Sequence, residues 1–590
     1  MKLPSINREH RGDVQALRAV AVILVILYHL KIIKGGFLGV DIFFVISGYV
    51  ITLNLSKSQG SLKEKLTKFY LRRAKRILPS SLVVVILTAL LTKIFLAPIY
   101  QGRFRIDALW SSLMGANIGF GLHGLDYLQA TTAPSPFLHY WSLGVEEQFY
   151  IIWPLIFFLF ISKRSPKIFA VILPASIAIA LITTAIYPVF SFYLPTSRAF
   201  QFLFGAGLAI GPTFKGNKNL LAAFGWAGII GSALLIPDNL ANPNRFSMIP
   251  TVSTMLVIYA ESKLFTFKSL QYIGEISFTL YLVHWPVILL LGNGSQNIHG
   301  AKIFIALLAM AIATLLLSTF IELPFRYESF GHISPRNWVI ILALGTVIAQ
   351  AAYLLPGKSG SDKFQLDLSK PIIYTNGCHL DQRHSELKKN CTFGNTGPKV
   401  LLVGDSHAAQ WFPAFEKLAN ENKLTFTSQT KSSCPITTDS VYANGQIDKS
   451  CDKWHVNIVN LIRNNKFDYL IFSNFDHNNY KYSGNNGINN FISSIGTTKV
   501  IQLMDTPKPP NDSVACLSAN PSNPSTCSFP VQSIIKFRTS AIDPTLWLCT
   551  DICPAVLNGF NTYRDGSHIS VITAKNLSEK LYLELLKYNR

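Results

Sequence analysis

The chain is poor in charge, and its first 377 residues contain no cysteine. Only 14% of its 590 residues are Asp, Glu, Lys or Arg, whereas 49% are apolar. This composition excludes a wholly soluble protein, yet it is too polar for a membrane bundle alone. Up to about residue 356 the sequence holds repeated apolar runs of about 16–22 residues, long enough to span a bilayer. Beyond that point, a mixed α/β sequence rich in Asn, Ser, Lys and Asp indicates an attached soluble part.

All eight cysteines lie in the soluble part. An even number confined to one region indicates disulfides and an oxidising compartment. The alternative is a zinc site, but the spacings are irregular. Connectivity does not follow from sequence, and the simplest pairing joins sequence neighbours. These pairs are Cys378/Cys391, Cys434/Cys451, Cys516/Cys527 and Cys549/Cys553.

Acidic residues are scarce, and the formal net charge is +21. The distribution of this charge argues against a nucleic-acid partner, because much of the excess falls in short loops between apolar runs. Such Lys- and Arg-rich loops mark the cytoplasmic side of a membrane. The expected partner is therefore the lipid bilayer. The first apolar run lacks a small-residue cleavage site and carries His29, so we interpret it as a retained span and not as a signal peptide.

The positions of the basic segments and the odd number of expected spans predict the topology. Basic residues before residue 12 and between residues 57 and 76 place the N-terminus and that loop inside. The segment 106–121 is expected to loop back or lie at the outer interface. Eleven spans with an inside N-terminus leave the C-terminal domain outside, where the cysteines also belong. The expected spans are about 14–32, 37–55, 79–97, 140–161, 168–188, 198–213, 219–236, 247–262, 271–292, 302–322 and 338–356.

Four ionisable residues lie where hydrocarbon is expected, near the outer half of the spans. An intramembrane ionisable group is costly and is by default a candidate functional residue. His29 lies toward the outer end of the first span, and Asp41 about a turn inside the second. His139, Glu146 and Tyr150 are spaced by seven and four residues and share one helix face. We expect His29, Asp41, His139 and Glu146 to be catalytic, although a single histidine in a span is often only a polar strut.

The inner side offers arginines. A guanidinium fork binds phosphate in a bidentate manner and is always charged, so an arginine cluster fits a phosphorylated ligand. The plain alternative is that these arginines only set topology. Glu147, His284 and Glu322 are secondary candidates. The expected ligand-binding arginines are Arg18, Arg72, Arg73 and Arg76.

Six motifs, in order over roughly residues 10–330, resemble the acyltransferase-3 membrane family: LRAVAVILVILYH, GGFLGVDIFFVISGYVI, FYLRRAKRILP, HYWSLGVEEQFY, ISFTLYLVHWP and IELPFR. The resemblance implies transfer of an acyl group, usually acetyl, from cytoplasmic acetyl-CoA to a carbohydrate outside. It also implies that His29 is the catalytic histidine and that Arg72, Arg73 and Arg76 handle the donor. A neutral His29 imidazole could act as a general base or receive the acyl group itself.

The soluble part contains a candidate hydrolase triad. The segment KVLLVGDSHAAQW, residues 399–411, predicts a buried strand, a tight turn and a helix start that present Ser406. Far along the chain, YRDGSHISV supplies Asp565 and His568, which gives a triad in the order Ser, Asp, His. The alternative for the second segment is a plain surface turn.

This pattern resembles the SGNH hydrolase-like domain fused to many acyltransferase-3 proteins, over about residues 378–590. The usual oxyanion glycine and asparagine are not evident. Asn474 is a candidate donor, whereas SSCP at 432–435 is no glycine block.

The expected fold is a multi-span α-helical membrane bundle of about ten helices plus one linking helix, followed by a flavodoxin-like three-layer α/β domain. The expected domains are 1–335 (acyltransferase), 336–357 (linking helix), 358–396 (periplasmic connector) and 397–590 (SGNH-like).

The two resemblances imply a multi-pass O-acetyltransferase of the bacterial inner membrane, and the charge pattern predicts a cytoplasmic N-terminus and a periplasmic C-terminal domain. Acetyl-CoA is the expected donor, and no metal is expected. A surface polysaccharide is the expected acceptor, first of all lipid-linked lipopolysaccharide O-antigen and alternatively peptidoglycan. Two other classes remain open: a transporter-like bundle with a fused carbohydrate esterase, and a non-catalytic glycan sensor.

Overall fold

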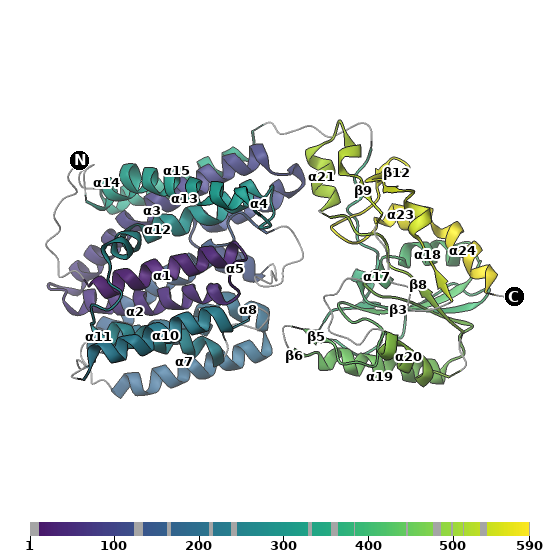
Figure 1. The fold of residues 1–590 in the computed structure, drawn as a ribbon, viewed down its shortest axis with the longest axis horizontal. Helices are drawn as coiled ribbons and strands as arrows, with labels where there is room; N and C mark the ends of the chain where they lie inside the picture. Colours follow the sequence, from purple (N-terminus) through teal and green to yellow (C-terminus); the bar gives the residue numbers. More distant parts are fainter. Residues whose placement is uncertain are drawn as a thin grey trace. The chain divides into compact units, whose positions relative to one another are not determined.

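A computed structural model describes residues 11–122, 134–161, 167–211, 216–237, 243, 245–327, 333–355, 364–382, 384–443, 446–475, 485–496, 499–510, 512–531 and 540–588. The chain forms two compact units, and the main division falls between residues 357 and 358 (Figure 1). Two of the basic residues used for the topology prediction, Lys2 and Arg8, lie outside the described residues.

The first unit is helical, and a helix occupies each of the eleven expected spans. Eight of the described helical segments are long and apolar enough to cross a membrane, and α7, α9 and α11 are not among them. The helices are α1 (Gly12–His29), α2 (Gly39–Ser56), α3 (Leu62–Phe95), α6 (Tyr140–Ile156) with η3 (Phe157–Ile161), α7 (Lys167–Ile186), α9 (Pro195–Ile210), α10 (Lys218–Leu235), α11 (Met248–Ala260), α12 (Lys268–Leu291), α13 (Ala301–Leu317) with η5 (Ser318–Glu322), and α15 (Pro335–Ala352).

Shorter helices connect these elements. The segment expected to loop back forms α4 (Gln101–Ser112) and α5 (Ala116–Leu122), each too short to span a bilayer. The others are η1 (Gly35–Leu38), η2 (Pro98–Tyr100), α8 (Pro188–Tyr193), η4 (Arg245–Ser247) and α14 (Leu323–Arg326).

The basic loop expected before the third span is helical instead. Ser61 and Glu64 form a capping box, in which each side chain accepts a hydrogen bond from the other residue's backbone N–H. The residues that follow are largely Leu, Lys and Arg, which favour helix. Helix α3 therefore begins at Leu62, and its arginines are held on a rigid element that continues into the span.

Helices α2 and α9 pack so closely at two glycines that no side chain fits between their backbones. A Cβ atom added to Gly48 would lie 1.9 Å from the carbonyl oxygen of Phe202, and one added to Gly205 would lie 1.9 Å from that of Val45. Small residues permit such close helix contacts within membranes. The approach brings polar groups of both helices together, including a buried ion pair described below.

The second unit is an α/β domain built on a seven-stranded sheet with the order β1-β4-β3-β7-β8-β10, in which β2 pairs with β4. Every pairing in this sheet is parallel except that of β2. The strands are β1 (His379–Leu380), β2 (Thr392–Phe393), β3 (Lys399–Gly404), β4 (Thr425–Lys431), β7 (Tyr469–Ser473), β8 (Lys499–Leu503) and β10 (Ala541–Ile542).

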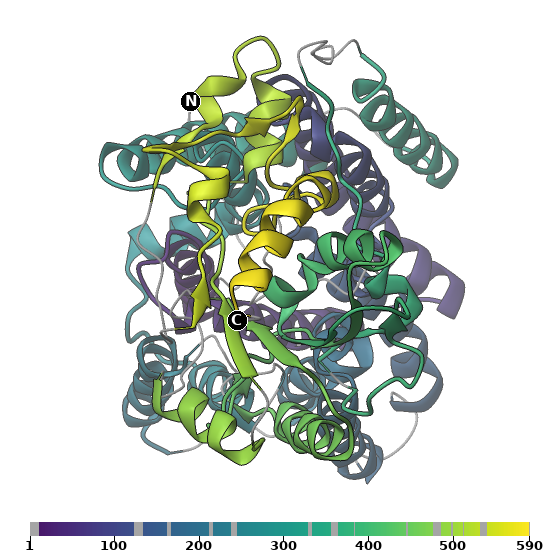
Figure 2. The same ribbon diagram turned by 90° about the vertical axis from the view of Figure 1, so that its right-hand side faces the viewer.

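Helices cover both faces of this sheet (Figures 1 and 2). Alternate residues of β3 point to opposite faces, as strand geometry requires. Val400 and Leu402 belong to the core that includes α18 (Phe412–Asn420) and α24 (Ser578–Lys587). Leu401 and Val403 belong to the core under α19 (Lys449–Asn464) and α20 (Asn485–Ser494). The expected three-layer α/β fold is confirmed.

The remaining elements of this unit are short. The helices are α16 (Ile373–Asn376), α17 (Ser406–Ala409), α21 (Ser513–Ala519), η6 (Pro524–Cys527), α22 (Thr545–Leu548) and α23 (Val571–Asn576). Three two-stranded pairs join β5 (Tyr442–Ala443) to β6 (Gln446–Ile447), β9 (Phe529–Pro530) to β11 (Ile552–Cys553), and β12 (Val556–Leu557) to β13 (Phe560–Asn561).

All four expected disulfides are present in this unit, so the neighbour pairing is confirmed. Cys434 and Cys451 lie close to His455, in a cluster with ligand-like spacing. Their sulfur atoms are bonded to each other and so offer no thiolate to a metal. The disulfides are Cys378–Cys391, Cys434–Cys451, Cys516–Cys527 and Cys549–Cys553.

Candidate active sites

Three histidines from separate helices meet inside the membrane unit. His29 ends α1, His139 immediately precedes α6, and His284 lies in the middle of α12; all three are buried. Nδ1 of His29 lies 2.9 Å from Nε2 of His284. The His139 and His284 ring centroids are 5.6 Å apart. The structure thus brings His29 and His139 together as expected and adds His284, which the sequence ranked only as a secondary candidate.

The hydrogen bonds fix which nitrogen of His29 can act as a base. Nδ1 of His284 lies 2.5 Å from the carbonyl oxygen of Tyr281, which can only accept a hydrogen bond, so that nitrogen carries the proton. Nε2 of His284 then accepts a hydrogen bond from Nδ1–H of His29. In a neutral imidazole the other nitrogen holds the lone pair, so Nε2 of His29 is the basic atom. A histidine therefore orients His29.

This relay predicts a strong effect of His284→Ala. Loss of the acceptor frees the His29 ring to rotate, and misplacement of a base by about 1 Å can cost about 10²-fold in rate. We expect kcat for acetyl transfer to fall by about that factor, with little change in KM. Tyr281→Phe is the matched variant, because it keeps the backbone carbonyl that accepts from His284. Since Tyr281→Phe also removes the hydroxyl contact to the His139 carbonyl, the decisive outcome is that of His284→Ala, and a wild-type kcat in a folded His284→Ala chain would contradict the relay.

His139 is held by the backbone. Its Nε2 lies 2.9 Å from the carbonyl oxygen of Leu282 and donates to it, while its own carbonyl accepts from the hydroxyl of Tyr281 at 3.0 Å. His139 and α12 are therefore locked together. We expect His139 to help position the rings of His29 and His284.

Asp41 pairs with an arginine. Its Oδ1 lies 3.2 Å from Nη1 of Arg198 on α9, and both side chains are no more than 2% exposed. The Arg198 guanidinium also lies over the rings of Trp141 and Phe192. Breaking a buried ion pair by removing one partner costs roughly 3–5 kcal/mol. This contact joins α2 to α9, and the expected catalytic role of Asp41 stays a prediction.

Glu146 belongs to a polar group between α2 and α6. Its Oε1 accepts a hydrogen bond from the Tyr150 hydroxyl at 2.6 Å, as the spacing of four residues predicts, and another from Ser47. The Arg73 guanidinium lies 4.8 Å from the centre of the Tyr150 ring. Glu146 is thus placed beside the arginines of α3.

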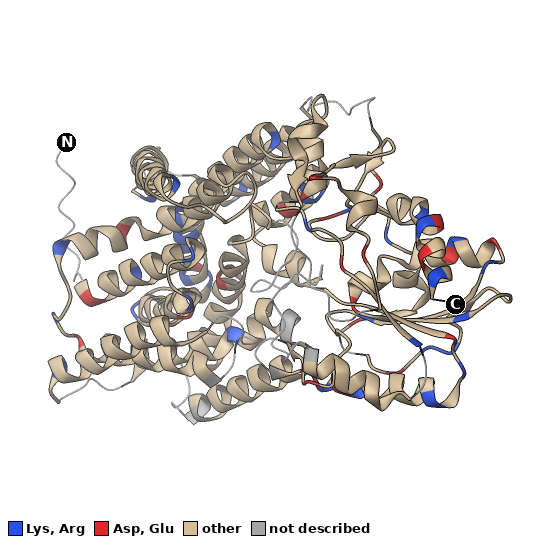
Figure 3. Cartoon of the chain, turned by 45° about the vertical axis from the view of Figure 1, so that its right-hand side comes forward, with Lys and Arg blue, Asp and Glu red and all other residues tan. Residues whose placement is uncertain are grey.

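Arginines from three segments gather within the bundle. Arg18 of α1 is an electrostatic neighbour of Arg76 on α3 and of Arg326 on α14, and Arg73 also neighbours Arg76. Figure 3 shows blue and red residues gathered among the otherwise tan helices of this unit. Arg72, in contrast, is exposed. Such a cluster suits a ligand with several phosphates.

This arrangement predicts that substitutions of different arginines of α3 change the KM for acetyl-CoA by different amounts. Arg76→Ala is expected to raise KM for acetyl-CoA by about 10- to 10²-fold, the equivalent of one charge-assisted hydrogen bond. Arg72→Ala is the matched control and is expected to change KM only slightly, because Arg72 lies on the exposed side of the helix. Initial rates against acetyl-CoA concentration separate the two variants. Equal effects would contradict the proposed donor site.

In the α/β unit, the candidate triad lies at the point where the strand order reverses. The strand β3 is flanked by β4, which follows it in the chain, and by β7. Ligands of open parallel sheets bind at the carboxyl ends of the strands at such a point. Gly404 ends β3 with φ +138°, and a Cβ there would lie 2.0 Å from the carbonyl oxygen of Ser473. Only glycine permits this turn, which presents Ser406 at the start of α17.

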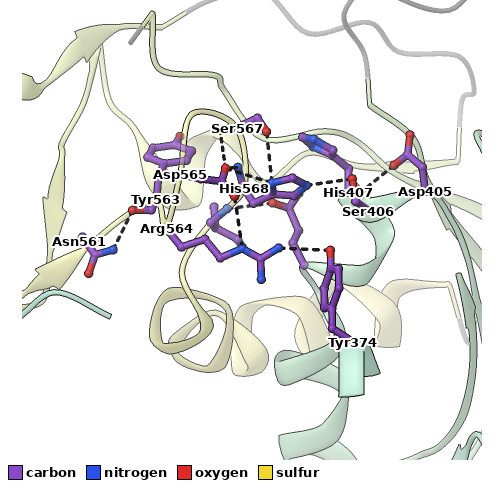
Figure 4. Close-up of polar contacts among 12 residues, drawn as sticks. Tyr374, Asp405, Ser406, His407, Asn561, Tyr563, Arg564, Asp565, Ser567 and His568 are labelled. Atoms are coloured by element: carbon purple, nitrogen blue, oxygen red, sulfur yellow. Dashed lines mark hydrogen bonds and ion pairs between the residues drawn. The ribbon is translucent and has the colours of Figure 1, made fainter. Parts of the chain in front are cut away.

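Ser406, His568 and Asp565 form a connected triad (Figure 4). Oγ of Ser406 lies 2.9 Å from Nε2 of His568. Nδ1 of His568 lies 2.9 Å from Oδ2 and 3.0 Å from Oδ1 of Asp565. The Asp565 carboxylate also accepts the backbone N–H groups of Ser567 and His568, each at 2.8 Å. The geometry is that of a serine activated by an oriented imidazole.

The electrostatics of the triad favour a neutral base and a charged acid partner. Burial opposes the charge of Asp565, but the His568 imidazole and two backbone N–H groups hold the pKa of its carboxyl below the ordinary value. Burial first and the nearby His407 second lower the pKa of His568. His568 is therefore unprotonated and able to accept the Ser406 proton at neutral pH.

The oxyanion donors differ from the sequence expectation. The amide of Asn474 is engaged at both ends by the backbone of Ile436, with 2.8 Å from the Ile436 nitrogen to Oδ1 and 3.3 Å from Nδ2 to its carbonyl oxygen. The backbone N–H of Ser432 donates to the carbonyl of Leu380. Both groups serve the local fold. At the start of α17, the backbone N–H groups of His407 and Ala408 also serve the local fold, since both donate to Asp405.

Sequence reasoning missed the residues that surround the triad. His407 contacts Asp505, and Arg564 donates to the Tyr374 hydroxyl at 3.3 Å beneath the triad (Figure 4). Two of these adjoin triad members in the motifs GDSH and YRDGSH, which was the available signal. Asp505 follows β8, and its position at the same edge of the sheet as Ser406 could be inferred only from the strand order.

Family models match parts of both units. Residues 11–323 match the family model of the acyltransferase domain, and residues 377–582 match that of the SGNH domain fused to AT3 domains. A solved structure of the periplasmic domain of a Salmonella Paratyphi A lipopolysaccharide acetyltransferase aligns with a TM-score of 0.30 and 14% identity, covering 36% of this chain and 93% of that one.

Curated relatives are O-acetyltransferases by name. Peptidoglycan O-acetyltransferase OatA of Listeria monocytogenes is 32% identical over 360 residues, covering 55% of this chain and 57% of that protein. Putative peptidoglycan O-acetyltransferase YrhL of Bacillus subtilis is 30% identical, covering 56% and 58%. O-acetyltransferase OatA of Staphylococcus aureus is 30% identical, covering 53% and 57%. The chain spans little more than half the length of these relatives. With more than half of its residues matched to the acyltransferase domain, the chain belongs to the acyltransferase-3 family, in the form that carries a fused SGNH domain.

Proposed function

We propose that this chain is a membrane O-acetyltransferase that moves acetyl from acetyl-CoA to a hydroxyl of a cell-envelope glycan. One observation carries the proposal: an oriented histidine and an arginine cluster within the bundle share a chain with a Ser–His–Asp triad. A glycan sensor needs neither an oriented base nor an activated serine, and a transporter with a fused esterase needs no oriented histidine within its bundle.

The membrane unit handles the donor. Coenzyme A carries a pyrophosphate and a 3′-phosphate, and Arg18, Arg73 and Arg76 fit these groups. Nε2 of His29 attacks the thioester carbonyl or removes the proton of an attacking hydroxyl. The carbon–sulfur bond then breaks, and coenzyme A leaves as the thiol. Asp41, His139 and Glu146 hold the helices that line this site.

The α/β unit transfers acetyl to the glycan. Oγ of Ser406 attacks the carbonyl carbon of the incoming acetyl group while His568 takes the serine proton and Asp565 stabilises the imidazolium. The bond from acetyl to the group that carried it then breaks, and His568 gives the proton to that leaving group. A glycan hydroxyl then attacks the acyl-serine, and its proton returns through His568 to Ser406 as the ester bond to serine breaks. The result is a glycan acetyl ester and a regenerated serine.

The proposed topology places the two chemistries on opposite sides of a bacterial inner membrane. The N-terminus is cytoplasmic, where acetyl-CoA is made, and the α/β domain is periplasmic. The four disulfides favour that oxidising side. We assign residues 1–335 to donor chemistry, 336–357 to a linking span, 358–396 to a connector and 397–590 to the acceptor side.

Peptidoglycan is the proposed acceptor. The sequence first favoured lipopolysaccharide O-antigen, but the names of the curated relatives support the alternative, since two of them are called peptidoglycan O-acetyltransferases. The glycan strands of peptidoglycan carry many free hydroxyls, so no new chemistry is needed beyond that described for Ser406.

Reconstituted vesicles test this proposal. The full chain in proteoliposomes is supplied with radiolabelled acetyl-CoA and with either peptidoglycan glycan strands or O-antigen polysaccharide. We expect alkali-labile label on the glycan strands, with none when acetyl-CoA is omitted. Label only on O-antigen would replace the proposed acceptor, and label on neither polysaccharide would overturn the proposed function.

A further inference from the structure

A second histidine, which the mechanism above does not use, packs against the triad. His407 follows Ser406 directly, and its side chain is 3% exposed. The centroids of the His407 and His568 rings lie 4.5 Å apart with 36° between the ring planes. Figure 4 shows His407 and His568 close together beside Ser406. Any charge on His407 therefore acts directly on the base and on the nucleophile.

A carboxylate fixes His407. Nδ1 of His407 lies 2.6 Å from Oδ1 of Asp505, at the carboxyl end of β8, and the Asp505 side chain is 4% exposed. The same oxygen accepts the backbone N–H of Thr506 at 2.8 Å. The site thus contains two Asp–His pairs, Asp565–His568 and Asp505–His407, with the imidazoles adjacent.

The surrounding charges favour a cation at His407. Burial opposes that charge, but Asp505 first, and then Asp405 and Asp565, raise the pKa of His407 above its ordinary value. Two backbone N–H groups, those of His407 and Phe475, donate to the Asp405 carboxylate at 2.8 Å each. His407 therefore lies among acidic side chains, with Asp405 just before α17 and Asp505 just after β8.

The net effect of the groups around His568 is the opposite, because they lower the pKa of this histidine. Burial and His407 lower the pKa of His568, Asp565 opposes them, and Arg564 adds to the lowering. His379, at the start of β1, is a further electrostatic neighbour of His568; burial, His568 and Arg564 hold its pKa at about 3, so it is neutral. His407 is thus the imidazole with the strongest electrostatic effect on His568.

We propose that His407 is a positioning residue of this site: held by Asp505 as a cation, it opposes protonation of His568 and favours negative charge on Oγ of Ser406. A like charge disfavours a second charge nearby, and an opposite charge favours one. The serine would thus remain reactive at a pH at which an isolated Ser–His–Asp triad would be protonated. The inference rests on the proposed roles of Ser406 and His568 but not on the identity of donor or acceptor.

Labelling of Ser406 by a fluorescent fluorophosphonate tests this inference without any glycan. Oγ of Ser406 attacks phosphorus, His568 takes the proton, and fluoride leaves, so the rate reports serine reactivity directly. The full chain in detergent is labelled across the pH range in which imidazoles titrate. With His407→Gln, which keeps a donor toward Asp505, we expect the acid limb of the rate profile to move up by about one pH unit. The rate at its plateau should fall several-fold.

Asp505→Asn is the second variant, because it changes one oxygen and leaves His407 in place. Without the carboxylate His407 becomes neutral, so the acid limb should move in the same direction. The double variant should shift no further than either single variant, since both remove the same charge. Thermal unfolding of each variant identifies any that is misfolded, and one folded variant is sufficient for the test.

An acid limb that stays in place or moves to lower pH in a folded variant would overturn the inference. Absence of labelling in the wild type would overturn it together with the proposed role of Ser406. Normal labelling without acetyl transfer would count against the proposed function alone. Ser406→Ala sets the background.

Discussion

Ser406→Ala is expected to abolish acetylation of the glycan, with a fall of roughly 10⁴-fold or more, as found when the nucleophile of a serine triad is removed. The reason is geometric: Oγ of Ser406 is the triad atom that forms the acyl bond, and His568 lies 2.9 Å away to accept its proton. Release of acetate from purified glycan by mild alkali measures the effect, after normalisation to the amount of chain in the membrane.

Ser567→Ala is the matched control. This serine lies in the same turn, and its Oγ is 3.2 Å from Nδ1 of His568, but Asp565 provides the principal hydrogen bonds to that nitrogen. We expect its loss to change acetylation less than about 10-fold. If Ser406→Ala acetylates glycan normally, the α/β unit only binds and positions its substrate.

His29→Ala is the second variant with a large expected effect. It removes the basic nitrogen that the relay through His284 and the Tyr281 carbonyl orients. Loss of a general base costs about 10²- to 10⁴-fold, and loss of a nucleophile costs more. We expect both acetylation of glycan and consumption of acetyl-CoA by membranes to fall by this amount.

The exposed His299 of the same unit serves as the control. His299→Ala also removes an imidazole but should leave acetyl-CoA consumption unchanged. Since His29 is buried, membrane levels and the detergent-extracted melting temperature of His29→Ala must match those of the wild type. Consumption of acetyl-CoA at the wild-type rate by a folded His29→Ala chain would rule out the proposed membrane mechanism.

Features encoded by local patterns were predictable from the sequence. Apolar run length located all eleven helices, and the motif GDSH after a buried strand located Ser406. The disulfides followed from sequence proximity because short loops close at the smallest entropic cost. The basic segment before the third span was misassigned as a loop, because the capping box at Ser61 and Glu64 was overlooked.

Long-range pairings could not be predicted in the same way. His29 and His284 are 255 residues apart, and Asp41 and Arg198 are 157 apart. Their contacts depend on which helix faces pack together, and hydrophobic periodicity says little about facing in a bundle surrounded by lipid. The same holds for His407 and Asp505, which the strand order brings to one edge of the sheet.

The central claim is that the two units act in series, with acetyl passing from the histidine site to Ser406. The direct measurement is mass spectrometry of the peptide that contains Ser406, after the full chain has been incubated with acetyl-CoA without glycan. We predict acetyl-Ser406 in the wild type and none in the His29→Ala chain. Equal acetylation of Ser406 in both chains, or unmodified Ser406 in a wild-type chain that still acetylates glycan, would contradict the account.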